Sequence, residues 1–493
     1  MPAIPESAPP DSGFPILIVG TGFSGLAMAI RLKQAGFNDF LLLEKAGDVG
    51  GTWRENTYPG AACDVPSLLY SFSFEPNPGW SRAFSPQREI LEYLRHTARK
   101  YGIMPHIRFH AEVDGAAFDE ATGAWTVHTK DGESRRARAL VLGNGALHLP
   151  SRPNIPGRDS FAGQAFHSAQ WNHDYDLEGK RVAVIGTGAS TIQIVPKLAP
   201  IVSKVHVFQR TPPWIVPRMD RAFTPEEQAT FARAPWIQRA RRAAVYWKFE
   251  ARVLGFTVDQ RLLKLGEIIA KKHLHSQIKD PALRAALTPS YKMGCKRVLL
   301  SDDYYPALTK PSVELVTTSI QAIEPGGVRT TDGQLREVDA IVYSTGFNVA
   351  EYLTPIHLTG IGGCDLATTW RKSPEAYLGI TVAGFPNLYL LMGPNTGLGH
   401  NSMIFMIEAQ ARYAVQCIQA LRDQRLVSLD VRADTQSSFN VELQAKLVNT
   451  VWQSGCSSWY LTDTGRNASI WPGSTWDYWR RTRKVKLDDF VRR

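Results

Sequence analysis

Short apolar runs that lead into Gly-rich turns and then into helical stretches mark the beginning of the chain. Residues 16–19 are four consecutive aliphatic residues, followed by a Gly-rich turn at 20–25 and by a stretch of helical composition at 26–34. An apolar run bounded by turn signals is typical of a strand buried in a parallel sheet. A second run at 40–43 completes the unit. The pattern predicts strand, turn, helix and strand, an order found in dinucleotide-binding α/β proteins.

The same order of elements returns further along the chain. The apolar run 181–185 is followed by a Gly-rich turn at 186–191, by an apolar helical stretch, and by another apolar run at 205–208. Two complete units of this kind predict an α/β fold with two Rossmann-like dinucleotide-binding domains. Two more strands, at 140–142 and 340–343, are expected to carry the chain between these domains.

Residues 212–290 have a different pattern. They are rich in Ala, Arg, Leu and Lys at helical spacing, which predicts a helical insertion in the second domain. We expect its apolar stripe to pack on the neighbouring domain, with a membrane-surface helix as the alternative. The residues of this stripe are Trp236, Ile237, Ala240, Ala244, Trp247 and Leu254.

Length and composition agree with several domains. A chain of 493 residues with 44% apolar residues is too long for one ordinary core, so two or three domains are expected. No run of about 18 apolar residues occurs, so no transmembrane segment is predicted. Residues 1–13 are Pro-rich and lack a basic start and an apolar core, so we expect a disordered leader and not a secretory signal.

The cysteines are few and scattered. They stand at positions 63, 295, 364, 417 and 456, and no two have the C-x-x-C spacing. This spacing argues against a redox dithiol, a cysteine-rich zinc site and a disulfide framework. We therefore expect no metal site and a reduced, cytoplasmic compartment.

The net charge of +10 raises the question of nucleic-acid binding. The positive charge is not in one block, because part of it lies in residues 233–248 and part in residues 480–486. No zinc finger, helix-turn-helix or aromatic RNA-reading motif accompanies it. A solvated surface that attracts two polyanionic dinucleotides is favoured over a nucleic-acid partner.

The first Gly-rich turn has the complete spacing G-x-G-x-x-G. Gly20 permits the tight turn, Gly22 lets the backbone approach a pyrophosphate, and Gly25 allows the helix to pack closely on the strand. The N-terminus of the helix faces the phosphates. Glu44, at the end of the second strand, is placed to accept hydrogen bonds from an adenosine ribose.

The second turn keeps two of the three glycines. Gly186 and Gly188 remain, whereas Thr191 takes the third place, so helix and strand are expected to lie slightly further apart. The following strand ends in Arg210 instead of an acidic residue. A carboxylate there would repel a 2′-phosphate, whereas an arginine pairs with it through two hydrogen bonds. The second site is therefore predicted to take NADP in preference to NAD.

A spaced motif lies between the two turns. Phe161, Gly163, His167 and Trp171 have the spacing F-x-G-x3-H-x3-W. With a Gly-rich turn on either side, this motif resembles the signature of the flavoprotein monooxygenases of the Baeyer–Villiger type. The alternative is a flavin monooxygenase that oxidises sulfur or nitrogen of small lipophilic compounds, a group that usually carries an aromatic–Lys pair at the Trp position. The tryptophan favours the ketone oxidisers.

The resemblance implies which cofactor occupies which turn. Residues 50–64 are similar to the family segment G-x-W-x4-Y-P-G-x3-D, which lines the flavin ring, so FAD is expected at the first turn and NADP at the second. The predicted FAD contacts are Gly20, Gly22, Phe23, Ser24, Gly25, Glu44, Gly51, Thr52, Trp53, Asp64, Tyr70 and Val113. The predicted NADP contacts are Gly186, Gly188, Ala189, Ser190, Arg210, Thr211 and Lys296.

A division of the chain follows from these assignments. We expect the leader 1–13, an FAD-binding domain of residues 14–152 and 345–493, an NADP-binding domain of residues 153–211 and 291–344, and the helical insertion 212–290. The Trp-rich segment 454–479 is either a loop that folds over bound NADP or a structural aromatic cluster.

The resemblance also implies the reaction. NADPH reduces FAD, the reduced flavin forms a flavin peroxide with O2, and the peroxide attacks a small ketone, which rearranges to an ester or lactone. This chemistry needs a fixed cation in a pocket without water. We expect Arg297 to be the catalytic cation, Asp64 to orient it, and Lys296 to hold a phosphate of NADP. A flavin disulfide reductase is disfavoured, since no vicinal cysteine pair exists.

His167 has two possible roles. A histidine inside a signature suggests general acid–base catalysis. Its position between the two domains, together with the resemblance, suggests instead a hinge that couples domain motion to turnover. The hinge is favoured.

Overall fold

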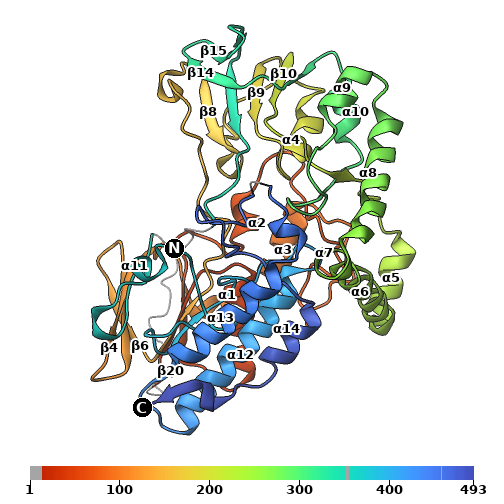
Figure 1. Ribbon diagram of the computed structural model, residues 1–493. Coiled ribbons are helices and arrows are strands. Elements are labelled where there is room, and N and C mark those ends of the chain that lie inside the picture. The colour runs from red at the N-terminus through yellow and green to blue at the C-terminus, as the bar shows by residue number, and fades with distance from the viewer. Residues whose placement is uncertain (1–13, 350–352, 354, 457) are drawn as a thin grey trace, which may run out of the picture.

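Two five-stranded parallel sheets form the centres of the two ends of the molecule (Figure 1). The computed structural model describes residues 14–349, 353, 355–456 and 458–493, so the expected leader lies outside the described residues. The first sheet has the order β19 (Leu388–Leu390), β7 (Ala139–Leu142), β1 (Ile16–Val19), β2 (Phe40–Leu43) and β3 (Ile107–Arg108). The second has the order β13 (Val313–Val316), β10 (Lys204–Phe208), β9 (Arg181–Ile185), β17 (Ala340–Tyr343) and β8 (Gln164–His167).

The strands follow the apolar runs of the sequence. The strands predicted at 16–19, 40–43 and 181–185 are confirmed, and β10 begins one residue before the predicted range. All four residues of β1 are buried, as expected for a central parallel strand covered on both faces. The first helix, α1 (Phe23–Gln34), begins three residues earlier than predicted, because the last residues of the Gly-rich turn already belong to the helix.

Long helices cover the first sheet. α1 packs against α12 (Met403–Asp423), which in turn contacts α14 (Thr475–Thr482). α13 (Ala433–Leu447) and α3 (Gln87–Lys100) lie at the same end of the molecule (Figure 1). Their apolar faces and the sheet share one large core.

The second sheet has a smaller cover. α4 (Thr191–Leu198) contacts α10 (Tyr304–Leu308), and both pack into a core built on the strands of this sheet. A separate group of helices runs along one side of the molecule between its two ends (Figure 1). These helices are α5 (Pro225–Arg233), α6 (Pro235–Glu250), α7 (Val253–Thr257), α8 (Leu263–Gln277) and α9 (Pro281–Ala286).

Smaller elements complete the described chain. One sheet has the order β18 (His357–Thr359), β4 (Val113–Asp119), β5 (Ala124–Thr129) and β6 (Ser134–Ala137), and another has the order β14 (Ile320–Glu324), β15 (Gly327–Thr330) and β16 (Leu335–Glu337). Two pairs of strands are β11 (Ile215–Val216) with β12 (Leu299–Leu300) and β20 (Leu429–Val431) with β21 (Phe490–Arg492). Two short helices are α2 (Thr52–Glu55) and α11 (Leu366–Trp370). None of the described helices combines the length and the apolarity that a membrane crossing demands. The architecture is the predicted α/β class with parallel sheets.

Candidate functional site

The first Gly-rich turn leaves no room for a side chain at its third glycine. A Cβ atom at Gly25 would lie 1.8 Å from the carbonyl oxygen of Gly20. Gly20 has a φ of +92°, a conformation that glycine adopts at little cost. No side chain caps the start of α1 at Gly22. The N–H groups of the first helical turn can therefore bind an anion from outside the chain.

Glu44 stabilises this turn from the end of β2. Its buried carboxylate accepts hydrogen bonds from the backbone N–H of Thr21 at 3.0 Å and from the Thr21 hydroxyl at 2.6 Å. The other oxygen accepts from the N–H of Ala46 at 3.1 Å. A carboxylate has about four accepting positions, so about one remains for a ribose hydroxyl.

An aromatic group lies beside the turn. The indole N–H of Trp53 donates to the Tyr70 hydroxyl at 3.1 Å, and Phe23 meets the Tyr70 ring edge-on with 5.5 Å between centroids. Gly51 lies over the turn, because a Cβ at Gly22 would be 3.6 Å from the Gly51 Cα. The structure thus brings four of the predicted FAD contacts, and the turn itself, into one place.

Arg297 and Asp64 form an ion pair across the molecule. The guanidinium donates to one carboxylate oxygen through Nε at 2.9 Å and also through Nη2. The charge of Asp64 is the main reason why the pKa of Arg297 lies above its usual range. Burial raises the pKa of the nearby Tyr460 to about 12, so this hydroxyl stays neutral. Because 39% of the Arg297 side chain remains exposed, the site offers a fixed cation with an open face.

The second Gly-rich turn is built differently from the first. A Cβ at Gly186 would lie 2.3 Å from the carbonyl oxygen of Ser344, whereas a Cβ at Gly188 would meet nothing within 4 Å. Thr191, in place of the third glycine, is fully buried, and its hydroxyl donates to the Gly186 carbonyl at 3.0 Å. α4 starts without a capping side chain. This turn also presents an open surface at the start of a helix, where an anion can bind.

Two cations lie near the second turn without an acidic partner. Arg210 is exposed at the end of β10, and no ion pair or hydrogen bond of its side chain occurs within the described residues. The pKa of Lys296 is lowered, first by burial and then by the charge of Arg210. The Lys296 ammonium lies 5.1 Å from the centroid of the Tyr291 ring. Two neighbouring cations that repel each other suit a doubly charged phosphate.

The flavin-loop candidate 50–64 also contacts α4. The Tyr58 hydroxyl donates to the side-chain oxygen of Gln193 at 2.9 Å, and the Gln193 amide donates to the carbonyl of Ala62 at 3.0 Å. A Cβ at Gly60 would lie 2.6 Å from the Gln193 carbonyl oxygen. A cavity of about 540 Å³ opens beside this contact. Sequence reasoning missed the contact, although Gly60, with a φ of +85°, is the residue that permits it.

The spaced motif follows the edge of the second sheet. Its histidine, His167, ends β8 opposite Tyr343 of β17 and is fully buried. The Nδ1 atom accepts a hydrogen bond from the N–H of Ala169 at 3.1 Å. Burial is the main cause that lowers the pKa of His167 to about 4, and the interaction of the imidazole with the backbone carbonyl of Gly346 opposes this shift. At neutral pH this imidazole is therefore uncharged.

The other motif residues have packing roles in this structure. A Cβ at Gly163 would lie 2.4 Å from the carbonyl oxygen of Asp339, so the chain passes too close for a side chain. Trp171 meets Phe166 edge-on at 5.1 Å, and Phe161 packs on the other core of the second sheet. Just beyond the motif, His173 hydrogen-bonds to the Thr57 hydroxyl at 2.7 Å. The motif thus connects the second sheet to the flavin-loop candidate.

The remaining predicted contacts occupy the expected elements. Ser24 is buried within α1, Thr52 begins α2, Val113 is buried at the start of β4, and Ala189 and Ser190 precede α4. The carbonyl of Thr211 accepts a hydrogen bond from the Thr187 hydroxyl at 3.0 Å. In the described part of the chain, no group of three or more His, Cys, Asp or Glu residues is placed to hold a metal.

Comparisons with known proteins relate the chain to flavin-dependent monooxygenases. Residues 15–356 match the family model described as flavin-binding monooxygenase-like. A Baeyer–Villiger monooxygenase of Pseudomonas aeruginosa is 49% identical over 95% of this chain and 89% of its own length. A Baeyer–Villiger monooxygenase of Streptomyces coelicolor is 46% identical over 96% of this chain and 92% of its own. The chain belongs to the Baeyer–Villiger monooxygenases.

Solved structures of similar monooxygenases share the whole fold. The OTEMO complex with FAD and NADP has a TM-score of 0.88 at 26% identity and covers 97% of this chain and 99% of that chain. Cyclohexanone monooxygenase from Rhodococcus sp. Phi1 bound to NADP+ has a TM-score of 0.88 at 27% identity with the same coverage. Both Gly-rich turns of this Baeyer–Villiger monooxygenase therefore belong to a fold that holds two dinucleotides in its relatives.

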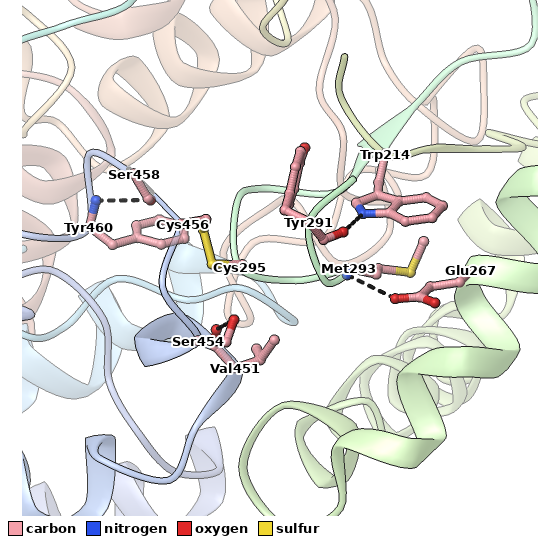
Figure 2. The surroundings of a disulfide bond; sticks show 10 residues. All are labelled: Trp214, Glu267, Tyr291, Met293, Cys295, Val451, Ser454, Cys456, Ser458 and Tyr460. Atoms are coloured by element: carbon pink, nitrogen blue, oxygen red, sulfur yellow. Dashed lines mark hydrogen bonds between the residues drawn. A yellow bond between two sulfur atoms is a disulfide. The ribbon is translucent and has the colours of Figure 1, made fainter. Parts of the chain in front are cut away.

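The expectation of no disulfide is wrong for one pair of cysteines. Cys295, next to Lys296, is bonded to Cys456 near the C-terminal end (Figure 2). Cys63, Cys364 and Cys417 are free. The two bonded residues are 161 positions apart, so the search for close spacings in the sequence could not detect the pair. The bond joins the loop that carries Lys296 and Arg297 to the C-terminal segment of the monooxygenase.

The expected packing of the apolar stripe on the insertion helices is also largely wrong. Trp236, Trp247 and Leu254 are 69%, 56% and 48% exposed. α6 instead packs through another face, where Gln238, Phe249 and Glu250 are buried. Helical spacing predicted the helix correctly but could not show which face would be covered.

The Trp-rich segment is mainly structural in this monooxygenase. Trp471 is buried, meets Tyr478 edge-on at 5.0 Å and donates to the carbonyl of Ser474 at 3.0 Å. Trp459 remains 48% exposed. Both parts of the segment mix buried and exposed rings, because Tyr460 is buried as well as Trp471, whereas Trp476 is 49% exposed.

Proposed function

We propose that the chain catalyses the NADPH- and O2-dependent oxidation of small ketones to esters or lactones, with FAD at the first Gly-rich turn and NADP at the second. The observation that carries this proposal is the Arg297–Asp64 ion pair, which lies beside Tyr70 and next in sequence to Lys296. When bound, FAD takes hydride from NADPH and activates O2 for insertion beside the ketone carbonyl.

The first turn fits a flavin dinucleotide. The open start of α1 would hold its pyrophosphate, and the remaining accepting position of Glu44 would hold its ribose. Trp53 and Tyr70, fixed to each other by a hydrogen bond, would border the flavin ring together with Asp64. These groups bind and orient the cofactor and take no proton from it.

The second turn fits NADP. Gly188 and the start of α4 would accept the pyrophosphate, while Arg210 and Lys296 would share the 2′-phosphate. Arg210 has no acidic partner among the described residues, so the phosphate would supply a counterion for its side chain. The proposal includes an FAD-binding domain of residues 14–152 and 345–493 and an NADP-binding domain of residues 153–211 and 291–344.

Arg297 would act on the reacting oxygen atoms. Asp64 holds the guanidinium in place through two donors to one carboxylate oxygen, which leaves its other N–H groups free. A cation fixed in this way stabilises negative charge that develops on a carbonyl oxygen without reorganising during the reaction. Asp64 is therefore a positioning residue and Arg297 the catalytic one.

His167 would serve as part of a hinge and not as an acid or base. With a pKa of about 4 and no exposure, it does not exchange protons near neutral pH. It lies where β8 and β17 end, beside the segment that leads back to the first sheet, and its ring meets that of Phe347 edge-on at 5.6 Å. This position suits a joint between the two sheets.

The cytoplasmic location also stays a proposal. It rests on the three free cysteines Cys63, Cys364 and Cys417, of which Cys364 is exposed. Besides FAD and NADPH, the proposed reaction requires a small-molecule ketone and O2.

The test combines a substrate panel with one variant. The FAD-loaded protein is supplied with NADPH, 18O2 and either ketones or thioethers, and products are identified by mass spectrometry. We expect esters or lactones that carry one 18O atom. Arg297→Ala should bind FAD and oxidise NADPH, yet form about 100- to 1,000-fold less ester, as when one oxyanion-stabilising group is removed.

The matched control is Arg135→Ala, which removes an exposed arginine of β6 and should leave ester formation unchanged. Undiminished ester formation by Arg297→Ala would refute the role of Arg297. Oxidation of thioethers with no ester from any ketone would refute the proposed reaction.

A further inference from the structure

A second cavity is lined by residues other than those assigned to the reaction. It has a volume of about 360 Å³ and is formed where α1, α6, α12 and α14 meet. Four arginines line it, namely Arg31, Arg239, Arg242 and Arg412. Three aromatic residues, Tyr246, Phe405 and Trp479, line it as well. None of these residues belongs to either Gly-rich turn or to the Arg297 site.

The four arginines of this cavity outnumber the one acidic residue in its lining. None of its four arginines takes part in an ion pair within the described part of the chain. Glu408, the acidic residue on the wall, has its carboxylate held by Ser73, through the backbone N–H at 2.6 Å and the hydroxyl at 2.5 Å. The charge of Glu408 acts on Arg242 and Arg412 from a distance, without an ion pair to either, and a single acid leaves an excess of positive charge.

Arg412 has buried hydrogen-bond donors that lack an acceptor. Its Nε and Nη2 atoms are buried and have no hydrogen-bond acceptor, and the same is true of Nε of Arg31. Burial, followed by the charges of Arg31 and Arg483, lowers the pKa of Arg412. A buried donor without an acceptor is destabilising, and more so when it is charged. An incoming oxyanion would supply the missing acceptors and a negative charge.

The aromatic wall indicates what the anion carries. The rings of Tyr246 and Phe405 are stacked at 5.2 Å, and the guanidinium of Arg412 lies 5.3 Å from the centroid of Trp479. Trp479 stacks at 4.7 Å on Trp476, which is 49% exposed. The cavity therefore has a cationic part next to an apolar part that continues to the surface.

We propose that this cavity binds an amphipathic anion, an oxyanion head on an apolar chain. Arg412 and Arg242 would hold the head, and Tyr246, Phe405 and Trp479 would contact the chain. Arg242 already donates through Nη1 to the carbonyl of Leu68 at 2.7 Å, which fixes its guanidinium while other N–H groups remain available. The proposal is independent of the reaction, because no residue is shared between the two sites.

The test uses decanoate as the probe and the FAD-loaded protein. Decanoate below its micelle concentration is titrated by calorimetry, and the same titration is made with 1-decanol, which lacks the charge, and with acetate, which lacks the chain. We expect saturable binding of decanoate alone. Arg412→Gln should raise its Kd at least tenfold, Arg412→Lys less, and the exposed Arg135→Gln not at all.

Two arms distinguish the source of the anion. Cosedimentation with phosphatidylglycerol vesicles that is lost in Arg412→Gln would assign the site to an anionic lipid, whereas decanoate binding without cosedimentation would assign it to a free amphipathic anion. If Arg412→Gln does not fold, Arg242→Gln takes its place. Equal affinity of wild type and variant for decanoate, or equal binding of 1-decanol, would overturn the proposal. Unchanged NADPH oxidation in Arg412→Gln keeps this outcome separate from the fate of the proposed function.

Discussion

The two Gly-rich turns solve the same packing problem in different ways. At the first turn, helix and strand approach so closely that a Cβ at Gly25 would lie 1.8 Å from a backbone oxygen. At the second turn, Thr191 occupies the equivalent place and hydrogen-bonds to the corresponding oxygen of Gly186 at 3.0 Å. The third glycine of the motif is therefore a requirement of helix–strand distance and not of phosphate binding, since both turns keep an uncapped helix start.

The strand ends beside the turns differ just as clearly. Glu44 is buried and already holds three N–H or O–H donors, so it is part of the first turn's own structure. Arg210 is exposed and holds none within the described residues. A residue that is engaged by its own turn shapes the site, whereas a residue left free is available to select the ligand.

The largest effect is expected when the third glycine of the first turn receives a side chain, as the second turn has at Thr191. Gly25→Ala should lose FAD and destabilise the fold by about 3 kcal/mol, because the backbone must move to admit a methyl group. The ratio of FAD to protein and the thermal unfolding curve measure this. Gly326→Ala, where a Cβ would meet nothing within 4 Å, is the control and should change neither. Retention of FAD by Gly25→Ala would show that the close approach is not required.

Removing the free cation at the second turn should affect one cofactor only. Arg210→Ala is expected to raise the KM for NADPH about 10- to 100-fold, as a charge-assisted contact to the 2′-phosphate is worth about 1.5–3 kcal/mol. The KM for NADH should change little, because NADH has no such phosphate. Steady-state kinetics with both cofactors make the comparison. An equal rise for NADH would mean that Arg210 does not contact the 2′-phosphate.

The stability of the second sheet should decrease more in acid than that of the first sheet, because of the buried His167. Its pKa of about 4 in the folded state lies below the ordinary value of 6.5, so the unfolded state binds the proton first as the pH falls. Stability from this residue is present above pH 6.5 and should decrease by about 2 kcal/mol between pH 7 and pH 5. Urea unfolding at both pH values measures it. His167→Gln should show a smaller pH dependence than the wild type, and an identical dependence would contradict the assignment.

The smallest effect concerns the hydroxyl that replaces the third glycine. Thr191→Val keeps the shape but removes the donor to the Gly186 carbonyl, and should cost about 1 kcal/mol of stability. Thr191→Ser keeps the donor and should lose less. Chemical denaturation of the two variants compares them, and equal losses would show that the methyl group matters more than the hydrogen bond.

Local elements of the fold could be predicted from the sequence, and distant contacts could not. The strands at 16–19, 40–43 and 181–185 and the two turns depend on neighbouring residues, so pattern and glycine spacing were sufficient. The pairing of Arg297 with Asp64 was expected only through the family resemblance, because the two lie far apart in the chain.

Other features left no local signal. The contact of Tyr58 with Gln193 depends on how the two sheets meet, and no spacing in the sequence encodes it. The exposure of Trp236 and Trp247 depends on which face of α6 meets its neighbours, whereas periodicity shows only that the residues share a face.

The Cys295–Cys456 bond makes a closed ring of the chain between these residues. The ring includes β17, β19 and α12, and so parts of both sheets. A single peptide-bond cut in the loop at 360–365 would open the ring without separating the two fragments until the bond is reduced. The bond closes a loop between residues 161 positions apart, which lowers the conformational entropy of the unfolded chain. In the chain-entropy model this raises the free energy of unfolding by about 5 kcal/mol. Thermodynamic stability would thereby depend on the thiol–disulfide balance of the surroundings.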